Sequence, residues 1–131
     1  MKIKPLIVVE DYDIDYEIIK ETIEESGINN PLIRFKNGLE IMNYLKDENF
    51  EKPVAILLDL YMPEMDGFEF LKSAKEEKLL KNIKIIVLTA KNTDKTRIES
   101  YKLGVNGYLE KPFDVFDFLQ IIRSNNYNWY L

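Results

Sequence analysis

Short apolar runs alternate with longer amphipathic stretches along the chain, and this alternation constrains the possible folds more than any other feature. The runs are rich in Val, Ile and Leu and have the length of strands that are buried on both faces of a sheet. We predict strands at residues 3–9, 31–35, 54–58 and 83–88, with a weaker one at 105–109. Each is followed by a stretch long enough for a helix.

The stretches between the strands show helical spacing. In the first, Ile14, Ile18, Ile19 and Ile23 recur at intervals of three and four residues, which predicts one buried stripe, and Gly27 suits the left-handed position after a last helical turn. Side-chain N-caps and glycine stops define further ends. Helices are therefore predicted at residues 14–26, 38–47, 64–78, 94–103 and 114–124, with caps at Asn37 and Thr93 and a stop at Gly104.

Regular alternation of strands and helices predicts a doubly wound α/β fold, in which right-handed crossovers place helices on both faces of a parallel sheet. No composition shift or repeat divides the chain, so we expect one domain over residues 1–131, with residues 125–131 as a short C-terminal tail. Open sheets of this kind bind ligands at the carboxyl ends of their strands. Functional residues are therefore expected directly after each strand.

Composition excludes several classes of protein. There is no Cys, so neither disulfides nor thiolate metal sites are possible, and a cytoplasmic location is expected. The apolar run at residues 6–9 is too short for a signal peptide or a membrane span. The net charge is −5, and Lys and Arg form no consecutive block. We therefore expect no direct partner among nucleic acids or membranes.

Five polar residues come directly after predicted strands. Glu10 and Asp11 follow the first strand, Asp59 the third, Thr89 the fourth and Lys111 the fifth. Carboxylates gathered at one edge repel each other unless a cation keeps them ionised, and oxygen ligands without His or Cys favour Mg²⁺. A carboxylate on such an ion, facing an ammonium, can attack phosphorus to give an aspartyl phosphate, which is one of several uses of such a site.

Four sequence blocks resemble the receiver domain of two-component response regulators. They are VVED at 8–11, LLDLYMPEMDG at 57–67, VLTA at 87–90 and GYLEKPF at 107–113, in the order and spacing of that family. The resemblance covers essentially the whole chain. It implies a flavodoxin-like sheet of five parallel strands in the order 2-1-3-4-5, and a domain that accepts a phosphoryl group and signals by changing shape.

The resemblance also implies the roles of single residues at the metal site. Asp59 would be the phosphoacceptor, and Asp11 and Asp59 would bind Mg²⁺ directly. Glu10 would act through a metal-bound water, and Tyr61 through its main-chain carbonyl. Tyr61 and Lys91 occupy positions that flank the path of the hydrolytic water in this family, so a bulky Tyr61 should shield the aspartyl phosphate.

A second group of residues is assigned to switching. The resemblance implies that Thr89 and Lys111 contact the phosphoryl oxygens and that Thr89 moves toward them. This movement would vacate space for Tyr108, the aromatic residue that changes rotamer. The peptide bond before Pro112 would be cis, consistent with the low cost of that isomer at proline.

Each candidate also has a purely structural interpretation. Glu10 and Asp11 could form a solvated acidic turn or cap the first helix, Thr89 could bond only to the backbone, and Lys111 could be an ordinary loop residue. Tyr108 could be a static strand residue, because aromatic residues favour strands. It is much less expected that the acidic residues, the hydroxyl and the lysine would all occur at separate strand ends by chance.

Three other functions fit the fold less well. A flavodoxin-like electron carrier should have a loop rich in Gly and hydroxyls after the first strand, where Glu10 and Asp11 would repel a phosphate. A phosphatase that uses an aspartyl phosphate commonly has a second Asp where this chain has Tyr61. An unphosphorylated adaptor should lack the acceptor or the lysine, and Asp59 and Lys111 are both present.

We therefore expect a single-domain response regulator that is not an enzyme toward other substrates but catalyses its own phosphorylation and dephosphorylation. Its phosphodonor would be a histidine kinase or a phosphotransfer protein. The phosphorylated form would either switch a surface that binds another protein or pass the phosphoryl group on in a phosphorelay.

The C-terminal part of the chain is the expected output face, composed of residues 94–124 and the tail. We predict that it forms a homodimer, because the last helix is more apolar than one core stripe requires and the tail, with Trp129, ends in aromatic residues. In this ending the chain is similar to single-domain regulators that partner bacterial phytochromes. A tail folded back over Phe116 is the alternative. The apolar residues of the last helix are Val115, Phe116, Phe118, Leu119, Ile121 and Ile122.

Overall fold

The computed structural model describes residues 3–91 and 93–124 and shows one parallel sheet. Its strands are β1 (Leu6–Val9), β2 (Leu32–Phe35), β3 (Ala55–Asp59), β4 (Lys84–Thr89) and β5 (Gly107–Glu110). They lie in the order β2-β1-β3-β4-β5, and every neighbouring pair is parallel, which confirms the predicted topology. The predicted tail at 125–131 lies outside the described residues.

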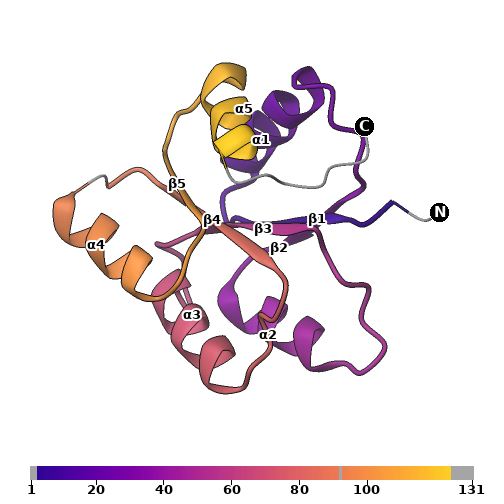
Figure 1. The fold of residues 1–131 in the computed structure, drawn as a ribbon, viewed down its shortest axis with the longest axis vertical. Helices are drawn as coiled ribbons and strands as arrows, with labels where there is room; N and C mark the ends of the chain where they lie inside the picture. Colours follow the sequence, from indigo (N-terminus) through magenta and orange to yellow (C-terminus); the bar gives the residue numbers. More distant parts are fainter. Residues whose placement is uncertain (1–2, 92, 125–131) are drawn as a thin grey trace.

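The helices cover both faces of the sheet (Figure 1). They are α1 (Asp13–Glu25), α2 (Gly38–Lys46), α3 (Gly67–Glu76), α4 (Asp94–Lys102) and α5 (Val115–Ser124). Helices α1 and α5 pack together above the sheet in the view of Figure 1, and α2 and α3 pack together below it. None of the helices in the described ranges is both long and apolar enough to cross a bilayer.

Alternating strand residues build a separate apolar core on each face. In β1, Leu6 and Val8 face α1 and α5, whereas Ile7 and Val9 face α2 and α3. All four are fully buried, as expected for a central strand of a doubly covered sheet. The two cores hold the carboxyl ends of β1, β3 and β4 in register at one edge, where the functional residues were predicted.

Local signals define most helix ends. Asn37 and Thr93 accept hydrogen bonds from the main-chain N–H groups of Glu40 and Thr96, so both predicted caps are confirmed. Helices α1 and α4 are each followed by a glycine with positive φ, which only glycine adopts without strain. These residues are Gly27 and Gly104, with φ of 88° and 85°.

Other predicted boundaries were wrong by a few residues. Helix α3 begins at Gly67 rather than at residue 64, because Asp66 forms a capping box with Glu69. Strand β5 begins at Gly107 rather than at residue 105. Just before it, the Asn106 side chain accepts a hydrogen bond from the Ile85 main chain and so takes the place of a strand partner.

The predicted stripe of α1 was only half right. Ile19 and Ile23 are buried, but Ile14 is 76% exposed and Ile18 is 49% exposed. The buried face of α1 is completed by Thr22, whose position fits the same side of the helix as Ile19 and Ile23. Relative to Ile19, Ile18 lies about 100° and Ile14 about 140° around the helix, away from the face that packs on the sheet.

Candidate functional site

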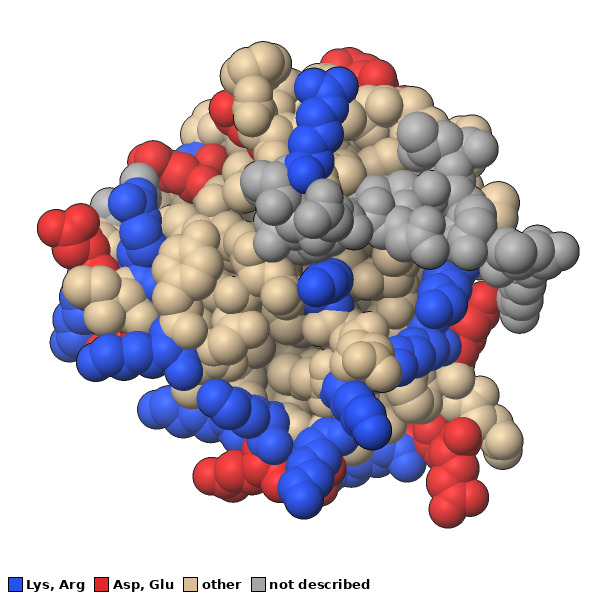
Figure 2. Space-filling view, in the orientation of Figure 1, with Lys and Arg blue, Asp and Glu red and all other residues tan. Residues whose placement is uncertain are grey.

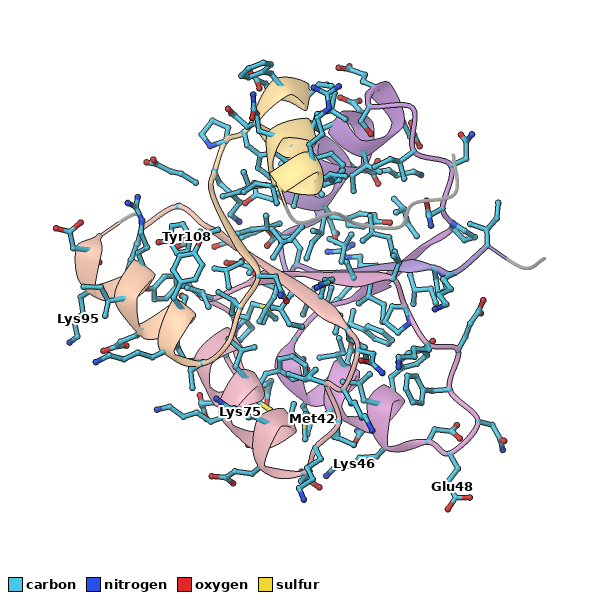
Figure 3. The ribbon with its side chains drawn as sticks, in the orientation of Figure 1. Met42, Lys46, Glu48, Lys75, Lys95 and Tyr108 are labelled. Atoms are coloured by element: carbon cyan, nitrogen blue, oxygen red, sulfur yellow. The ribbon has the colours of Figure 1, made fainter. Side chains whose placement is uncertain are left out.

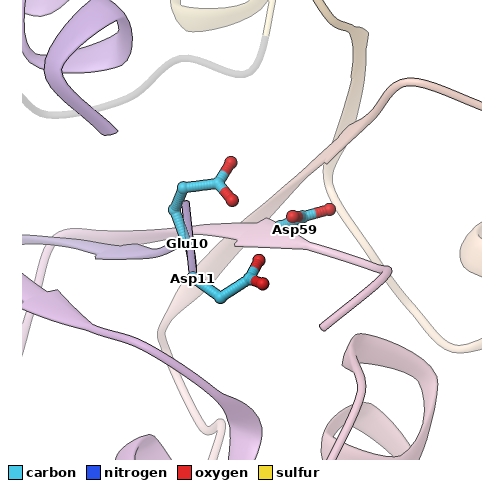
Figure 4. A group of neighbouring side chains, drawn as sticks. All are labelled: Glu10, Asp11 and Asp59. Atoms are coloured by element: carbon cyan, nitrogen blue, oxygen red, sulfur yellow. The ribbon is translucent and has the colours of Figure 1, made fainter. Parts of the chain in front are cut away.

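Three carboxylates meet at the carboxyl edge of the sheet. Asp59 is the last residue of β3, and Glu10 and Asp11 directly follow β1. One oxygen from each lies within 4.8 Å of the others, and Figure 4 shows the three groups facing one another. Glu10 and Asp59 are buried. The central position of β1 and β3 in the sheet thus produces the cluster that the sequence predicted.

Arg34 holds the main chain of this acidic segment in place, a role that the sequence analysis missed. From β2 its guanidinium donates hydrogen bonds to the main-chain carbonyls of Glu10, at 3.0 and 3.1 Å, and of Asp11, at 3.3 Å. It also forms an ion pair with Asp13 at 2.7 Å and lies over the ring of Tyr16. A single basic residue within an otherwise apolar strand was the available signal.

Lys111 brings a positive charge to the carboxylates. Its ammonium lies 2.7 Å from Glu10, 3.1 Å from Asp15 and 3.5 Å from Asp59. Asp15 was not singled out from the sequence, because only the packing of α1 against the sheet brings it to this edge. The bond between Lys111 and Pro112 is cis, as the resemblance implied.

Burial and charge shift the pKa of two of these groups. Burial raises the pKa of Glu10 to about 7, and the negative charge of Asp59 acts in the same direction, although the hydrogen bond from Lys111 opposes both. Burial alone would lower the pKa of Lys111. The hydrogen bond to Glu10 and the charges of Asp59 and Glu10 outweigh burial and raise the pKa of Lys111 above its ordinary value.

The acidic cluster fits a hard divalent cation. One carboxylate oxygen of Asp11 is buried and has no hydrogen-bond partner among the described residues, which is costly unless a ligand satisfies it. The donors of the cluster are all oxygens, which such ions prefer. One ammonium faces three carboxylates, so the site retains negative charge that a cation would neutralise.

The fourth strand contributes a hydroxyl to the same edge. Thr89 is fully buried, accepts a hydrogen bond from the main-chain N–H of Lys91 at 3.0 Å, and donates one to the Lys91 carbonyl at 3.4 Å. The structural interpretation of Thr89, a hydroxyl bonded to the backbone, therefore describes its contacts in this conformation. The acidic cluster, Lys111 and Thr89 form one site at the strand ends.

Comparison with known proteins assigns the chain to a family. The model of the response regulator receiver domain matches residues 6–123. The chain belongs to the response regulator receiver family. It is 35% identical over 130 residues to the response regulator Rcp1 of Synechocystis sp. (strain ATCC 27184 / PCC 6803 / Kazusa), an alignment that covers 96% of this chain and 88% of that protein. The family role is that of a phosphoacceptor in signalling.

Solved structures agree with this assignment. The bacteriophytochrome response regulator AtBRR superposes with a TM-score of 0.86 at 28% identity, over 100% of this chain and 98% of that one. The Mn²⁺-bound form of Rcp1 gives 0.79 at 35% identity, over 98% and 97% of the two chains. The phosphorylated cyanobacterial phytochrome response regulator RcpA gives 0.79 at 32% identity, over 98% and 94%. The predicted flavodoxin-like receiver fold is therefore confirmed.

In this receiver domain, Tyr108 is a residue of β5, and its side chain extends toward α4 (Figure 3). Its hydroxyl donates a hydrogen bond to the Lys91 carbonyl at 3.4 Å, and its ring lies near Tyr101 and under the guanidinium of Arg97. Burial raises the pKa of the Tyr108 hydroxyl. Tyr108 and Thr89 thus bond to the same main-chain carbonyl, that of Lys91, a connection that the sequence could not reveal.

Tyr61 extends from the end of β3 toward α4. Its main-chain N–H donates to Asp59 at 3.2 Å, and its hydroxyl is hydrogen-bonded to Thr96 of α4 at 3.2 Å. The ammonium of Lys91 lies 4.6 Å from the centre of its ring. The residues predicted to modulate lifetime, Tyr61 and Lys91, are therefore in contact with each other, and Thr96 is an additional partner that the sequence did not indicate.

Proposed function

We propose that Asp59 accepts a phosphoryl group from the phosphohistidine of a histidine kinase or phosphotransfer protein. The observation that carries the proposal is the meeting of three carboxylates within 4.8 Å, with Lys111 3.5 Å from Asp59. In the transfer, a carboxylate oxygen of Asp59 forms the new bond to phosphorus while the bond between phosphorus and the donor nitrogen breaks. The phosphorylated state of the relative RcpA supports this chemistry.

Mg²⁺ is the proposed cofactor. Asp11, Asp59 and the main-chain carbonyl of Tyr61 would hold it, with Glu10 acting through a bound water. The unsatisfied oxygen of Asp11 and the Mn²⁺-bound form of Rcp1 support a divalent ion, and the smaller, harder Mg²⁺ suits a site that also binds phosphoryl oxygens. When bound, the ion supplies positive charge to those oxygens. Lys111, 3.5 Å from Asp59, supplies further positive charge.

The same group of residues is proposed to catalyse the reaction without help from the kinase. Lys111 is already oriented toward Asp59 by Glu10 and Asp15, so little rearrangement is needed when a phosphoryl group arrives. Ala90, next to the site, is small and exposed and leaves room for a donor. A small-molecule phosphodonor should therefore be sufficient.

The experiment is intact-mass measurement after incubation with acetyl phosphate and Mg²⁺. The wild type should gain the mass of one phosphoryl group, and Asp59→Asn should not. Asp66→Asn is the matched control, because Asp66 lies on the same connection but serves as the cap of α3, a role that Asn also fills. A gain of mass by Asp59→Asn, or by the wild type with the metal chelated, would overturn the assignment.

Switching is proposed to begin at Thr89. When its hydroxyl turns to bind a phosphoryl oxygen, it leaves the main chain of Lys91, to which Tyr108 is also bonded. Tyr108 then moves into the vacated space. A coupling of this kind is typically worth about 1–3 kcal/mol. Thr89→Ala should still be phosphorylated but should bind the output partner no more tightly than the unphosphorylated protein does.

The output face is proposed to comprise α4, β5 and α5. Ile98 and Phe116 are 55% and 63% exposed, and Tyr101 is also exposed. Figure 2, in the orientation of Figure 1, shows uncharged surface beside α4 that Lys and Arg side chains border. Such surfaces anchor protein partners, including second copies of a chain.

A homodimer is the form of output that we propose for this face. Light scattering at high concentration, with and without a phosphoryl analogue, should detect the dimer. Truncation after Asn125 should dissociate it if the tail belongs to the interface. Loss of thermal stability at unchanged monomer mass would instead show that the tail covers its own helix. A wild type that remains monomeric with and without the analogue would overturn the dimer.

A further inference from the structure

Tyr61 connects the acceptor strand to α4 through side-chain hydroxyls. The Tyr61 hydroxyl lies 3.2 Å from the hydroxyl of Thr96, which is buried in the first turn of α4. The hydroxyl of Thr93, the cap of α4, donates to the same Thr96 oxygen at 2.9 Å, and the Thr96 N–H donates back to Thr93 at 3.1 Å. The N-terminus of α4 is thus tied to Tyr61 by a continuous chain of hydroxyl groups.

The main chain of Tyr61 is bonded to Asp59, and contacts with two other residues hold its ring. The Tyr61 N–H donates to Asp59 at 3.2 Å, the Lys91 ammonium lies over one face of the ring, and Phe68 meets the ring edge to face with centroids 6.4 Å apart. Even so, Tyr61 is 40% exposed. A ring exposed to that extent can be displaced into solvent unless its contacts hold it, and Thr96 is the partner of its hydroxyl among the described residues.

We infer that Thr96 is a positioning residue that sets the lifetime of the aspartyl phosphate by holding Tyr61 in place. The inference rests on the proposed role of Asp59. In hydrolysis, water forms a new bond to phosphorus, the bond between phosphorus and the Asp59 oxygen breaks, and inorganic phosphate leaves with the carboxylate restored. The Tyr61 ring, fixed by Thr96 and Lys91, restricts the approach of that water.

This arrangement links α4 to the chemistry of the site in both directions. A protein that binds α4 and displaces its first turn breaks the bond between Tyr61 and Thr96 and so changes the rate at which the phosphoryl group is lost. By reciprocity, a change in the position of Tyr61 alters the free energy of binding at α4. The rate at which Asp59 loses its phosphoryl group then depends on whether a partner protein is bound to α4.

The test follows the decay of the phosphorylated protein by intact mass after removal of the phosphodonor. Thr96→Val preserves shape and removes the hydroxyl. One hydrogen bond of about 1 kcal/mol corresponds to a roughly fivefold faster decay. Tyr61→Phe should accelerate decay to a similar extent while leaving the cap of α4 intact. The phosphorylated Thr96→Ser variant should lose its phosphoryl group at the wild-type rate, because serine retains the hydroxyl.

Two comparisons separate positioning from a general loss of structure. The double variant Tyr61→Phe with Thr96→Val should decay no faster than either single variant, because all three lack the same bond. Lys102→Ala is the matched control in α4. Lys102 is exposed in the last turn of the helix, away from the hydroxyls of Thr93 and Thr96, so decay should remain at the wild-type rate.

The outcomes are distinct. Three results would overturn the inference while the proposed role of Asp59 stands. They are decay of Thr96→Val at the wild-type rate, decay of Thr96→Ser faster than that of the wild type, and additive effects of the two substitutions in the double variant. A wild type that gains no phosphoryl mass would overturn that role and the inference with it.

Discussion

Helices α3 and α4 begin close to the same site but are attached to the molecule in different ways. Helix α3 buries Phe70, Leu71 and Ala74 in the core below the sheet. Helix α4, described over its whole length, buries only Thr96 and Ser100, whose polar side chains are hydrogen-bonded. Apolar packing thus fixes α3, whereas α4 is joined to the rest of the molecule by the hydroxyl pair of Tyr61 and Thr96 and by the contacts of Tyr101 and Arg97 with the Tyr108 ring.

The difference suits the two helices to different tasks. Apolar burial is non-directional and is lost only when the helix leaves the core. Hydroxyl groups can exchange partners over small displacements, so an element held by them can have two arrangements of similar free energy, as a switch requires. We therefore expect α3 to keep its position when Asp59 is phosphorylated and α4 to shift.

The largest effect is expected from breaking the attachment of α3. Phe70→Ala leaves a cavity in a fully buried position and should lower the free energy of unfolding by about 3–5 kcal/mol. The matched variant in α4 is Ile98→Ala, at an exposed apolar position. This substitution should change the free energy of unfolding by no more than about 0.5 kcal/mol. Urea unfolding measures both. Equal effects would show that α4 is anchored by apolar packing after all.

The acidic cluster at the ends of β1 and β3 should make the stability of the protein depend on pH. Because burial raises the pKa of Glu10 from 4.5 to about 7, the folded state binds a proton in this range that the unfolded state has released. Without metal, the free energy of unfolding should therefore fall as the pH rises from 4.5 to about 7. The pKa of about 7 already includes the opposing hydrogen bond from Lys111, and we expect the fall to be smaller than the loss caused by Phe70→Ala.

Glu10→Gln provides the control for this pH dependence. It cannot ionise, so its stability should vary less with pH than that of the wild type over the same range, and saturating Mg²⁺ should diminish the difference at neutral pH. Parallel pH profiles for the two proteins in chelator would show that the Glu10 carboxyl is not responsible.

A smaller effect is expected from weakening α4 at its hydrogen bonds. Ser100→Ala removes a buried donor to the Thr96 carbonyl and should lower the free energy of unfolding by about 1 kcal/mol. Hydrogen exchange should quicken in α4 while α3 remains as slow as in the wild type. Equal acceleration in both helices would show that they open as one unit, contrary to the comparison.

The smallest effect concerns the ion pair between α2 and α3. Lys46 and Glu77 lie 3.6 Å apart with both side chains about half exposed, so solvent screens their attraction. Lys46→Met should change the free energy of unfolding by less than about 0.5 kcal/mol. A clearly larger loss, measured by urea unfolding at low salt and absent at high salt, would mean that charge contributes to the attachment of α3.

Much of the fold could be predicted from the sequence because its signals are local. Strand composition, the caps at Asn37 and Thr93, and the glycine after α1 each depend on near neighbours, and the order of the strands followed from the family resemblance. The carboxylate cluster was also predictable, because the ends of parallel strands meet at one edge. The predictions that were wrong concern the burial of Ile14 and Ile18 in α1 and the ends of several helices and strands.

The remaining contacts join residues far apart in the chain and leave no local trace. Asp15 reaches Lys111, and Arg34 reaches the carbonyls of Glu10 and Asp11, only because the packing of α1 and β2 brings them there. The approach of Tyr61 to Thr96 likewise depends on where α4 packs relative to the end of β3, which local sequence preferences do not determine. The attachment of α4 therefore became visible only in the structure.

The different attachment of α3 and α4 can be tested by hydrogen exchange, measured by mass spectrometry with and without phosphorylation of Asp59. We predict changed protection in the first turn of α4 and in its connection to β4, with protection of α3 unaltered beyond its first turn. Thr89→Ala, phosphorylated to the same extent, should show a reduced change in α4. Equal changes in α3 and α4, or an unchanged α4 in fully phosphorylated protein, would contradict the account.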